Sequence, residues 1–442
     1  MIGAKKRLSQ FEREQIFDGN IVSLALKFDN KNTVRDIVEK LKAEVIGLHL
    51  RVEGEYLSQR PKNEIKVREL PSSSTFKSIR DMTAWATEKF LPNHNVELGT
   101  LASNDDTVII TLNHAICDGK FIAGIAHHVG DSQKNLDSYL PITFDEEFSN
   151  ELKNRSQFPP KFYQNDSNNV LFSKFGKQKC NNELVHECIY DTSSFSIYDK
   201  KKKVCKNLTS AIVTGFTLSV ASLNQEEAVF HVGGSMACNM RGILNDKKTH
   251  RVPNIINPSS DETFKEYPNG SQEPITLRHT NIFTVLPLTA PVTPYTKIDE
   301  CYKRLATSLK KRFSTEKIDL FNFRNGLDNL GSLSVGDGIM TCFSHMGPIK
   351  VSKPATDLYL YNKIFDRAFT FAIPLLTYAI VDEKTDRNEF HTQLRYDGNG
   401  LTARQAELLN ESLRHFLQNC ATNCTIGEAF KEIKEFQKSY GK

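Results

Sequence analysis

The fold is decided by the stretch Thr107-Val108-Ile109-Ile110-Thr111-Leu112-Asn113-His114-Ala115-Ile116-Cys117-Asp118-Gly119. Its first six residues are aliphatic or β-branched, which is typical of a buried strand. The run from Phe121 to Val129 then places its apolar side chains on one face of a helix. The pattern predicts a strand that delivers a histidine, followed four residues later by an aspartate, to a tight turn before a helix.

His114 is the residue of this stretch best suited to chemistry, because imidazole takes up a proton near neutral pH. The alternative is a structural histidine beside a plain turn, since Asp-Gly is a common turn signal. Cys117 lies between the histidine and the aspartate and invites interpretation as a thiol nucleophile. A cysteine in an apolar setting is more often a small core residue, so we expect Cys117 to have no catalytic part.

The size and charge of the chain limit the classes of protein it can belong to. Its 442 residues exceed one ordinary core, which predicts two domains or two lobes. The net charge of +4 is well short of a nucleic-acid-binding signature, so no nucleic-acid partner is expected. The run Lys200 to Lys203 is either a solvated loop or a patch that attracts an anionic ligand, such as the phosphates of a nucleotide.

The cysteines and the hydropathy of the chain allow predictions about metal sites, membrane segments and the cellular compartment. The closest of the nine cysteines, Cys420 and Cys424, have no second ligand pair nearby, so no metal site is predicted. The odd count, with no apolar stretch behind the first seven residues, predicts reduced thiols in the cytoplasm. The longest apolar run, Leu208 to Leu223, is too short and too hydroxylated for a transmembrane segment. Peripheral membrane contact through the N-terminal residues stays open.

The order of elements predicts two α/β lobes. Before the histidine stretch, strands alternate with helices, and the first helix begins at the capping box Ser9-Gln10-Phe11-Glu12. Residues 150–182 are rich in Asn, Ser, Lys and Pro and predict a linker. We therefore expect an N-terminal lobe over residues 1–175 and a C-terminal lobe over residues 176–442. The C-terminal lobe is predicted to contain a buried helix from Leu208 that Thr209 or Ser210 caps, strands at 184–190, 228–237, 281–288, 339–343, 369–373, 376–381 and 391–396, a Pro-rich loop at 249–273, and helices at 298–313 and 402–417.

Several elements, taken in chain order, resemble the CoA-dependent acyltransferase superfamily with the chloramphenicol acetyltransferase fold. They are Leu8-Ser9-x-x-Glu12, Asn113 to Gly119, Cys238-Asn239-Met240-Arg241, Ser344-His345-Met346-Gly347-Pro348, and the tail Leu394 to Gly398 before a helix. The motifs are most similar to those of alcohol acetyltransferases and polyketide-associated acyltransferases. The resemblance implies two lobes, each a mixed β-sheet with flanking helices, an active-site channel at the lobe interface, and a monomer.

The chain also departs from parts of this superfamily. Asn113 stands where condensation domains usually have a second histidine, and no Asp-Phe-Gly-Trp-Gly element of plant-type enzymes is present. His345 stands where relatives usually have Asn, so the role of the turn expected at Ser344 to Pro348 is open.

The resemblance implies transfer of an acetyl or other short acyl group from acyl-CoA to a hydroxyl acceptor. His114 would be the general base of a ternary complex that forms no acyl-enzyme. Asp118, expected to pair with Arg241 across the lobes, and Gly119 would support the site. Ser344 and Asn239 are the candidates for contact with the oxyanion or the substrate. Acyl-CoA, acetyl-CoA first, is then a co-substrate, and no permanently bound cofactor is expected.

Other functions remain open at this point. Because histidine serves both reactions, an N-acyltransferase acting on an amine is the near alternative to an O-acyltransferase. A non-catalytic binding or scaffold protein of the same fold is the alternative from another class. Carnitine-type acyltransferases also use a histidine, but their chains are longer and lack this arrangement of motifs.

Overall fold

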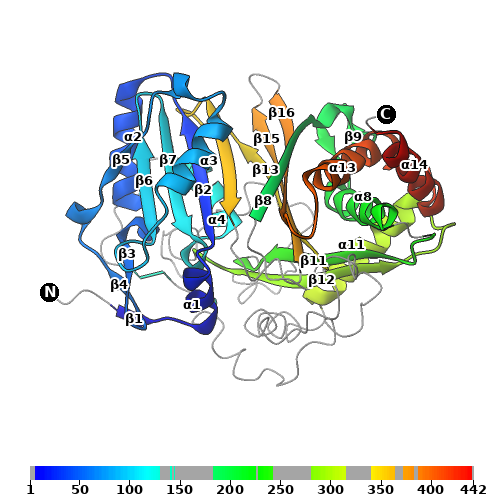
Figure 1. Cartoon of the computed structure of the whole chain (residues 1–442), viewed down its shortest axis with the longest axis horizontal. Helices are drawn as coiled ribbons and strands as arrows, with labels where there is room; N and C mark the ends of the chain where they lie inside the picture. The colour runs from blue at the N-terminus through cyan, green and yellow to red at the C-terminus, as the bar shows by residue number, and fades with distance from the viewer. Residues whose placement is uncertain are drawn as a thin grey trace.

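The computed structural model describes residues 5–129, 140–141, 144, 183–224, 227–241, 280–314, 340–363, 372–382 and 387–440. Over these residues the chain forms two lobes side by side, the first mainly blue and cyan and the second mainly green, orange and red (Figure 1). The predicted architecture of two α/β lobes is confirmed. The predicted linker at 150–182, the lobe boundary near residue 175 and the loop at 249–273 lie outside the described residues.

The N-terminal lobe is built on a mixed five-stranded sheet in the order β14-β2-β7-β6-β5. Alternate side chains of its strands serve two cores, because successive residues of a strand point to opposite faces. Leu24 and Leu26 of β2 pack with α2 and α4, whereas Ala25 packs with α3. The bounds are β2 Ile21–Lys27, β5 Val67–Glu69, β6 Gly99–Ser103, β7 Thr107–Asn113, α2 Lys31–Glu44, α3 Ile79–Lys89 and α4 Gly119–His128.

A small three-stranded sheet, β1-β4-β3, lies beside the first helix of this lobe. The capping box predicted at Ser9 is confirmed: the Ser9 hydroxyl accepts from the Glu12 amide at 3.2 Å, and Glu12 accepts from the Ser9 amide at 2.8 Å. The bounds are β1 Lys5–Arg7, α1 Gln10–Phe17, β3 Leu50–Glu53 and β4 Tyr56–Gln59, with short 3-10 turns η1 Ile46–His49, η2 Lys62–Glu64 and η3 Ser73–Thr75.

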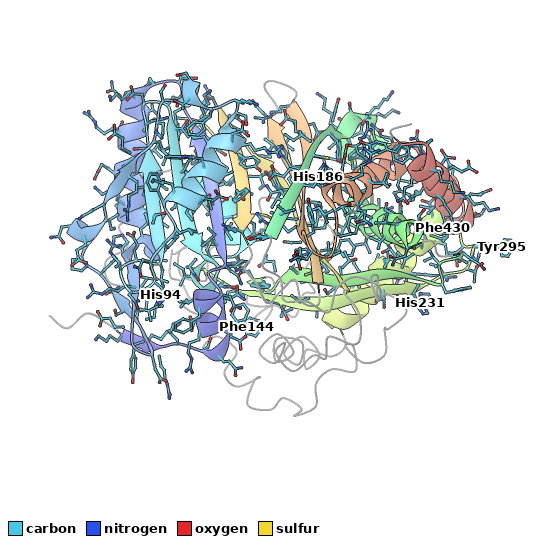
Figure 2. The ribbon with its side chains drawn as sticks, viewed as in Figure 1. His94, Phe144, His186, His231, Tyr295 and Phe430 are labelled. Atoms are coloured by element: carbon cyan, nitrogen blue, oxygen red, sulfur yellow. The ribbon has the colours of Figure 1, made fainter. Side chains whose placement is uncertain are left out.

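The fifth strand of the N-terminal sheet comes from the other end of the chain. β14 (Asp357–Lys363) pairs antiparallel with β2 along its whole length, and Figure 1 shows it in yellow beside the blue strand. The Tyr378 hydroxyl of β15 donates to the Leu360 carbonyl at 3.1 Å, which ties β14 to the second sheet. Phe144, which is labelled in Figure 2, packs in the core of the C-terminal lobe. The two lobes are therefore joined by strand β14, which the later part of the chain contributes to the N-terminal sheet.

The C-terminal lobe is built on a six-stranded mixed sheet in the order β12-β11-β13-β15-β16-β8. One face is covered by helices α8, α11, α13 and α14. The other face turns toward the N-terminal lobe, since Leu376, Tyr378 and Ile380 of β15 belong to that lobe's core. The bounds are β8 Glu183–Asp191, β11 His231–Asn239, β12 Phe283–Pro291, β13 Met340–Lys350, β15 Ala372–Asp382, β16 Arg387–Asp397, α8 Leu208–Leu223, α11 Ile298–Ser314, α13 Ala403–His415 and α14 Ile426–Ser439.

Two local predictions for this lobe need comment. Helix α8 is buried as predicted, but the expected cap at Thr209 or Ser210 is wrong. The helix begins at Leu208, directly after Asn207, whose backbone is left-handed (φ 55°) and whose side chain makes no capping bond. Lys200 to Lys203 are exposed in the turn between β9 (Tyr198–Asp199) and β10 (Val204–Cys205), which supports the interpretation as a solvated loop.

Candidate active site

His114 directly follows strand β7 and begins the short 3-10 turn η4 (His114–Ile116). The Asn113 side chain fixes the start of the turn by accepting from the Ala115 amide at 2.9 Å. The His114 amide donates to the Asn20 carbonyl, just before β2, at 2.7 Å. The backbone of His114 is thus held by two adjacent strands of the N-terminal sheet, while the residue as a whole stays partly exposed.

The C-terminal lobe reaches the same histidine from the other side. Asn281 donates through Nδ2 to the His114 carbonyl, and to the Ala115 carbonyl at 3.1 Å. The Phe283 ring at the start of β12 lies 5.5 Å from the His114 ring, centroid to centroid, and 5.8 Å from the Phe11 ring. His114 therefore lies at the lobe interface. Sequence reasoning missed both Asn281 and Phe283, although they begin the strand predicted at 281–288.

Asp118 connects the lobes rather than ending a simple turn. Its Oδ1 accepts from the Phe121 amide at 2.9 Å and so caps α4. Its Oδ2 accepts from the Ile282 amide and from Arg241 Nη1, each at 2.8 Å. Both carboxylate oxygens are therefore engaged, one within the N-terminal lobe and one with the C-terminal lobe.

The predicted pair between Asp118 and Arg241 is confirmed. The two side chains are 5% and 3% exposed, so the ion pair is buried. It is made through one guanidinium nitrogen, and that nitrogen also donates to the Asn239 side chain at 3.0 Å. Asn239 therefore helps to place Arg241, and its own side chain is partly exposed at the end of β11. That strand starts at His231, in the outer part of the lobe (Figure 2).

The segment Ser344 to Pro348 is not the turn that its sequence predicted. It lies inside β13, and the pairing with β15 shifts register between His345 and Pro348, which is a β-bulge. Gly347 has φ +76°, a left-handed conformation that glycine adopts readily. A bulge keeps the strand hydrogen-bonded while re-aiming its side chains, so Gly347 serves a bend within a strand and not the turn that the resemblance implied.

Gly119 lies directly against this bulge. A Cβ atom on Gly119 would be 3.1 Å from Sδ of Met346, closer than ordinary van der Waals contact. The absence of a side chain at Gly119 thus lets the first turn of α4 pack onto β13.

Ser344 lies on the face of the C-terminal sheet that carries Phe283. Pairing places Asn239 beside Phe283, and Ser235 beside Cys342. Because side chains two apart on a strand share a face, Ser344 lies on the same face as these residues. Its side chain is partly exposed. Its suggested contact with an oxyanion stays a prediction.

Two further ionisable residues belong to this region: Lys120 lies near Asp118 and Arg241, and His345 lies near Lys120. Burial, and after it the charge of Arg241, lower the pKa of Lys120. Burial, and after it the charge of Lys120, lower the pKa of His345 to about 4, and His345 Nδ1 is 2.9 Å from the Thr377 hydroxyl. His345 is thus an uncharged imidazole at neutral pH. Sequence reasoning had not considered Lys120.

Cys117 is fully buried in the core of the N-terminal lobe. Burial, together with the neighbouring Asp118 carboxylate, raises its pKa well above the ordinary value. Because the thiolate is the nucleophilic form, this environment disfavours a thiol nucleophile, in agreement with our expectation.

Within the described part of the chain, no three His, Cys, Asp or Glu side chains group as metal ligands would. The same residues include no helix that is long and apolar enough to cross a membrane.

No protein-family model matches the chain, and no curated protein does. Solved structures do match its fold. Polyketide synthase associated protein 5 from Mycobacterium tuberculosis superposes with a TM-score of 0.62 at 10% identity, covering 96% of this chain and 99% of that one. The first condensation domain of the calcium-dependent antibiotic synthetase, in complex with a substrate analogue, gives 0.65 at 12% identity over 96% and 99%.

A third match is the starter condensation domain of rhizomide synthetase, a mutant in complex with C8-CoA and Leu-SNAC. Its TM-score is 0.58 at 11% identity, and the match covers 95% of each chain. At these identities the comparisons show a shared two-lobed fold, and the fold alone, over nearly the whole chain.

Proposed function

We propose that the protein is a CoA-dependent acyltransferase that moves an acetyl or other short acyl group to a hydroxyl acceptor. The observation that carries the proposal is the partly exposed residue His114 at the lobe interface, with its backbone held by hydrogen bonds from both lobes. The shared fold adds support, since its solved examples include a condensation domain bound to an acyl-CoA.

In the proposed reaction His114 acts as a general base. The acceptor oxygen attacks the thioester carbonyl while its proton passes to an imidazole nitrogen, because a free alcohol is too weak an acid to ionise first. The tetrahedral intermediate then collapses, the carbon–sulfur bond breaks, and the CoA sulfur takes the proton from the imidazolium. The products are an ester and free CoA, and no covalent bond to the protein forms.

The expected contribution of His114 is on the order of 10² to 10⁴ in rate. The remainder of the acceleration must come from holding donor and acceptor together at reacting distance. A site between the two lobes would suit this requirement, because in this proposal each lobe contacts the bound substrates from one side.

The other residues of the site take supporting parts in this proposal. Asp118, Arg241 and Asn239 position the lobes around His114 through the buried ion pair and its hydrogen bonds. Gly119 lets α4 approach β13. Ser344, or a backbone amide near it, is the candidate donor to the oxyanion of the intermediate, since it shares a sheet face with Phe283.

The test is to incubate the purified protein with acetyl-CoA and longer acyl-CoAs, each against a panel of alcohols and amines. Free thiol is followed continuously, and products are identified by mass as esters or amides. Thiol release that depends on an alcohol supports the proposal, whereas release that depends only on amines favours N-acylation. A protein that binds acyl-CoA but releases no thiol with any acceptor supports the scaffold alternative instead.

A further inference from the structure

The first turn of α4 and the bulge of β13 meet beside the candidate site. Gly119 and Met346 are in close contact there, as the 3.1 Å approach of a Gly119 Cβ to Met346 Sδ indicates. Lys120 follows Gly119 and His345 precedes Met346. The charge of Lys120 acts on the His345 imidazole across this contact, and it also acts with the charges of Asp118 and Arg241. Lys120 therefore lies near His345 of the other lobe and near the ion pair.

Lys120 is a partly buried cation that makes no ion pair with any residue in the described ranges. The nearest acidic side chain in sequence, Asp118, already uses both oxygens for Phe121, Ile282 and Arg241. Arg241 adds a second positive charge to the same neighbourhood. The protein therefore holds two cations around one carboxylate here, and a partly buried cation without a counter-ion is unfavourable.

His345 completes the arrangement. Its Nδ1 lies 2.9 Å from the Thr377 hydroxyl of β15, which fixes the ring. Because burial and Lys120 keep the imidazole uncharged near neutral pH, it adds hydrogen-bonding capacity without a third charge. As whole residues, His345, Lys120, Gly119 and His114 are each partly exposed.

We propose that Lys120 and His345 form an anion-binding subsite that selects a substrate carrying a carboxylate or phosphate group. This inference rests on the proposed acyltransferase function and names the substrate class for it. The ligand anion supplies the counter-ion that Lys120 lacks and forms charge-assisted hydrogen bonds. A neutral substrate of the same shape leaves Lys120 partly buried and unpaired, so the site discriminates against it.

The anionic group can belong to the acyl chain or to the acceptor, and matched pairs separate the two sources. Succinyl-CoA and butyryl-CoA differ only in a terminal carboxylate or methyl group. The acceptors 3-hydroxybutyrate and 2-butanol differ in the same way, and glycerol 3-phosphate with glycerol tests phosphate. For each pair we would measure the ratio of kcat/KM values by thiol release. The ratio of dissociation constants would be measured by calorimetry on the His114→Ala protein, which needs no turnover.

The variants are Lys120→Met, Lys120→Arg and His345→Asn, with Lys303→Met on the exposed side of α11 as the matched control. At least one pair should favour its anionic member by about tenfold or more, on the scale of a charge-assisted contact. Lys120→Met should bring that ratio close to one, Lys120→Arg and His345→Asn should reduce it in part, and Lys303→Met should leave it unchanged.

The proposal is overturned if every pair shows the same ratio in the wild type and in Lys120→Met, or if the anionic members are disfavoured. The two claims fail separately. A Lys120-dependent binding preference without thiol release would sustain the subsite and contradict the acyltransferase function. Thiol release with no preference for charge would sustain the function and contradict the subsite.

Discussion

Arg241 donates through Nη1 to Oδ2 of Asp118 at 2.8 Å, and this buried contact joins the two lobes. The two residues are 123 positions apart in the sequence. The same carboxylate caps α4 and accepts from the Ile282 amide. The contact therefore fixes where the turn after His114 sits relative to β11 and β12. The contact therefore sets the geometry of the lobe interface, and that geometry positions His114.

Replacing one member of this pair should destabilise the protein strongly. Arg241→Met or Asp118→Ala leaves a buried charge without its partner, so each should lower the free energy of unfolding by about 3–5 kcal/mol. The double variant should lose clearly less than the sum of the two, because neither charge is then stranded. Urea unfolding of the four proteins gives the coupling directly. Additive losses would mean that the two side chains do not interact in solution.

The contact between Gly119 and Met346 makes a second prediction. Gly119→Val should lower the free energy of unfolding by about 1–3 kcal/mol, as overpacking usually does, because its side chain meets Met346 Sδ and Cε. Adding Met346→Ala to the Gly119→Val protein removes the atoms that the valine meets, so it should restore part of the lost free energy of unfolding. Thermal unfolding of the single and double variants is the measurement, and a double variant less stable than Gly119→Val would contradict the packing described.

Cys117 should be dispensable for chemistry. Cys117→Ala removes a buried sulfur and should lower the free energy of unfolding by about 1 kcal/mol while turnover is retained, because burial holds the thiol protonated. Intact-protein mass spectrometry of samples quenched during turnover should find no acylated protein. An acyl adduct that disappears in Cys117→Ala would contradict a direct transfer between bound substrates.

His345 predicts a pH dependence of stability. Its pKa is lowered from 6.5 to about 4 in the folded protein, so between those values the unfolded chain binds a proton that the folded protein does not. Stability should therefore rise as pH increases from about 4 to 6.5, by no more than about 3 kcal/mol from this group. The difference in unfolding free energy between wild type and His345→Asn, measured across this range, should change with pH. A constant difference would show that the His345 pKa is ordinary.

Much of the site could be predicted because its signals are local. The apolar run before His114 predicted β7, the capping box at Ser9 predicted α1, and the resemblance to a known superfamily implied the Asp118–Arg241 pair. Each rests on residues adjacent in sequence or on a resemblance that spans the chain.

The contacts that were missed depend on long-range pairing. Nothing near Asp357 to Lys363 indicates that β14 joins a sheet formed by residues more than 240 positions earlier. Likewise, Phe283 meets the His114 ring only because β12 begins at the lobe interface. The resemblance implied a turn at Ser344 to Pro348, where the structure has a bulge with a left-handed Gly347, a conformation that both structures accommodate.

The most direct test of the account is thiol release from acyl-CoA by the wild type and by His114→Ala, compared at equal concentration of folded protein. Circular dichroism and calorimetric binding of the acyl-CoA would first establish that the variant folds and binds. We expect acceptor-dependent thiol release to fall by on the order of 10² to 10⁴ in the variant, with donor affinity retained. A folded His114→Ala protein that releases thiol at the wild-type rate would contradict the central claim that His114 is the base.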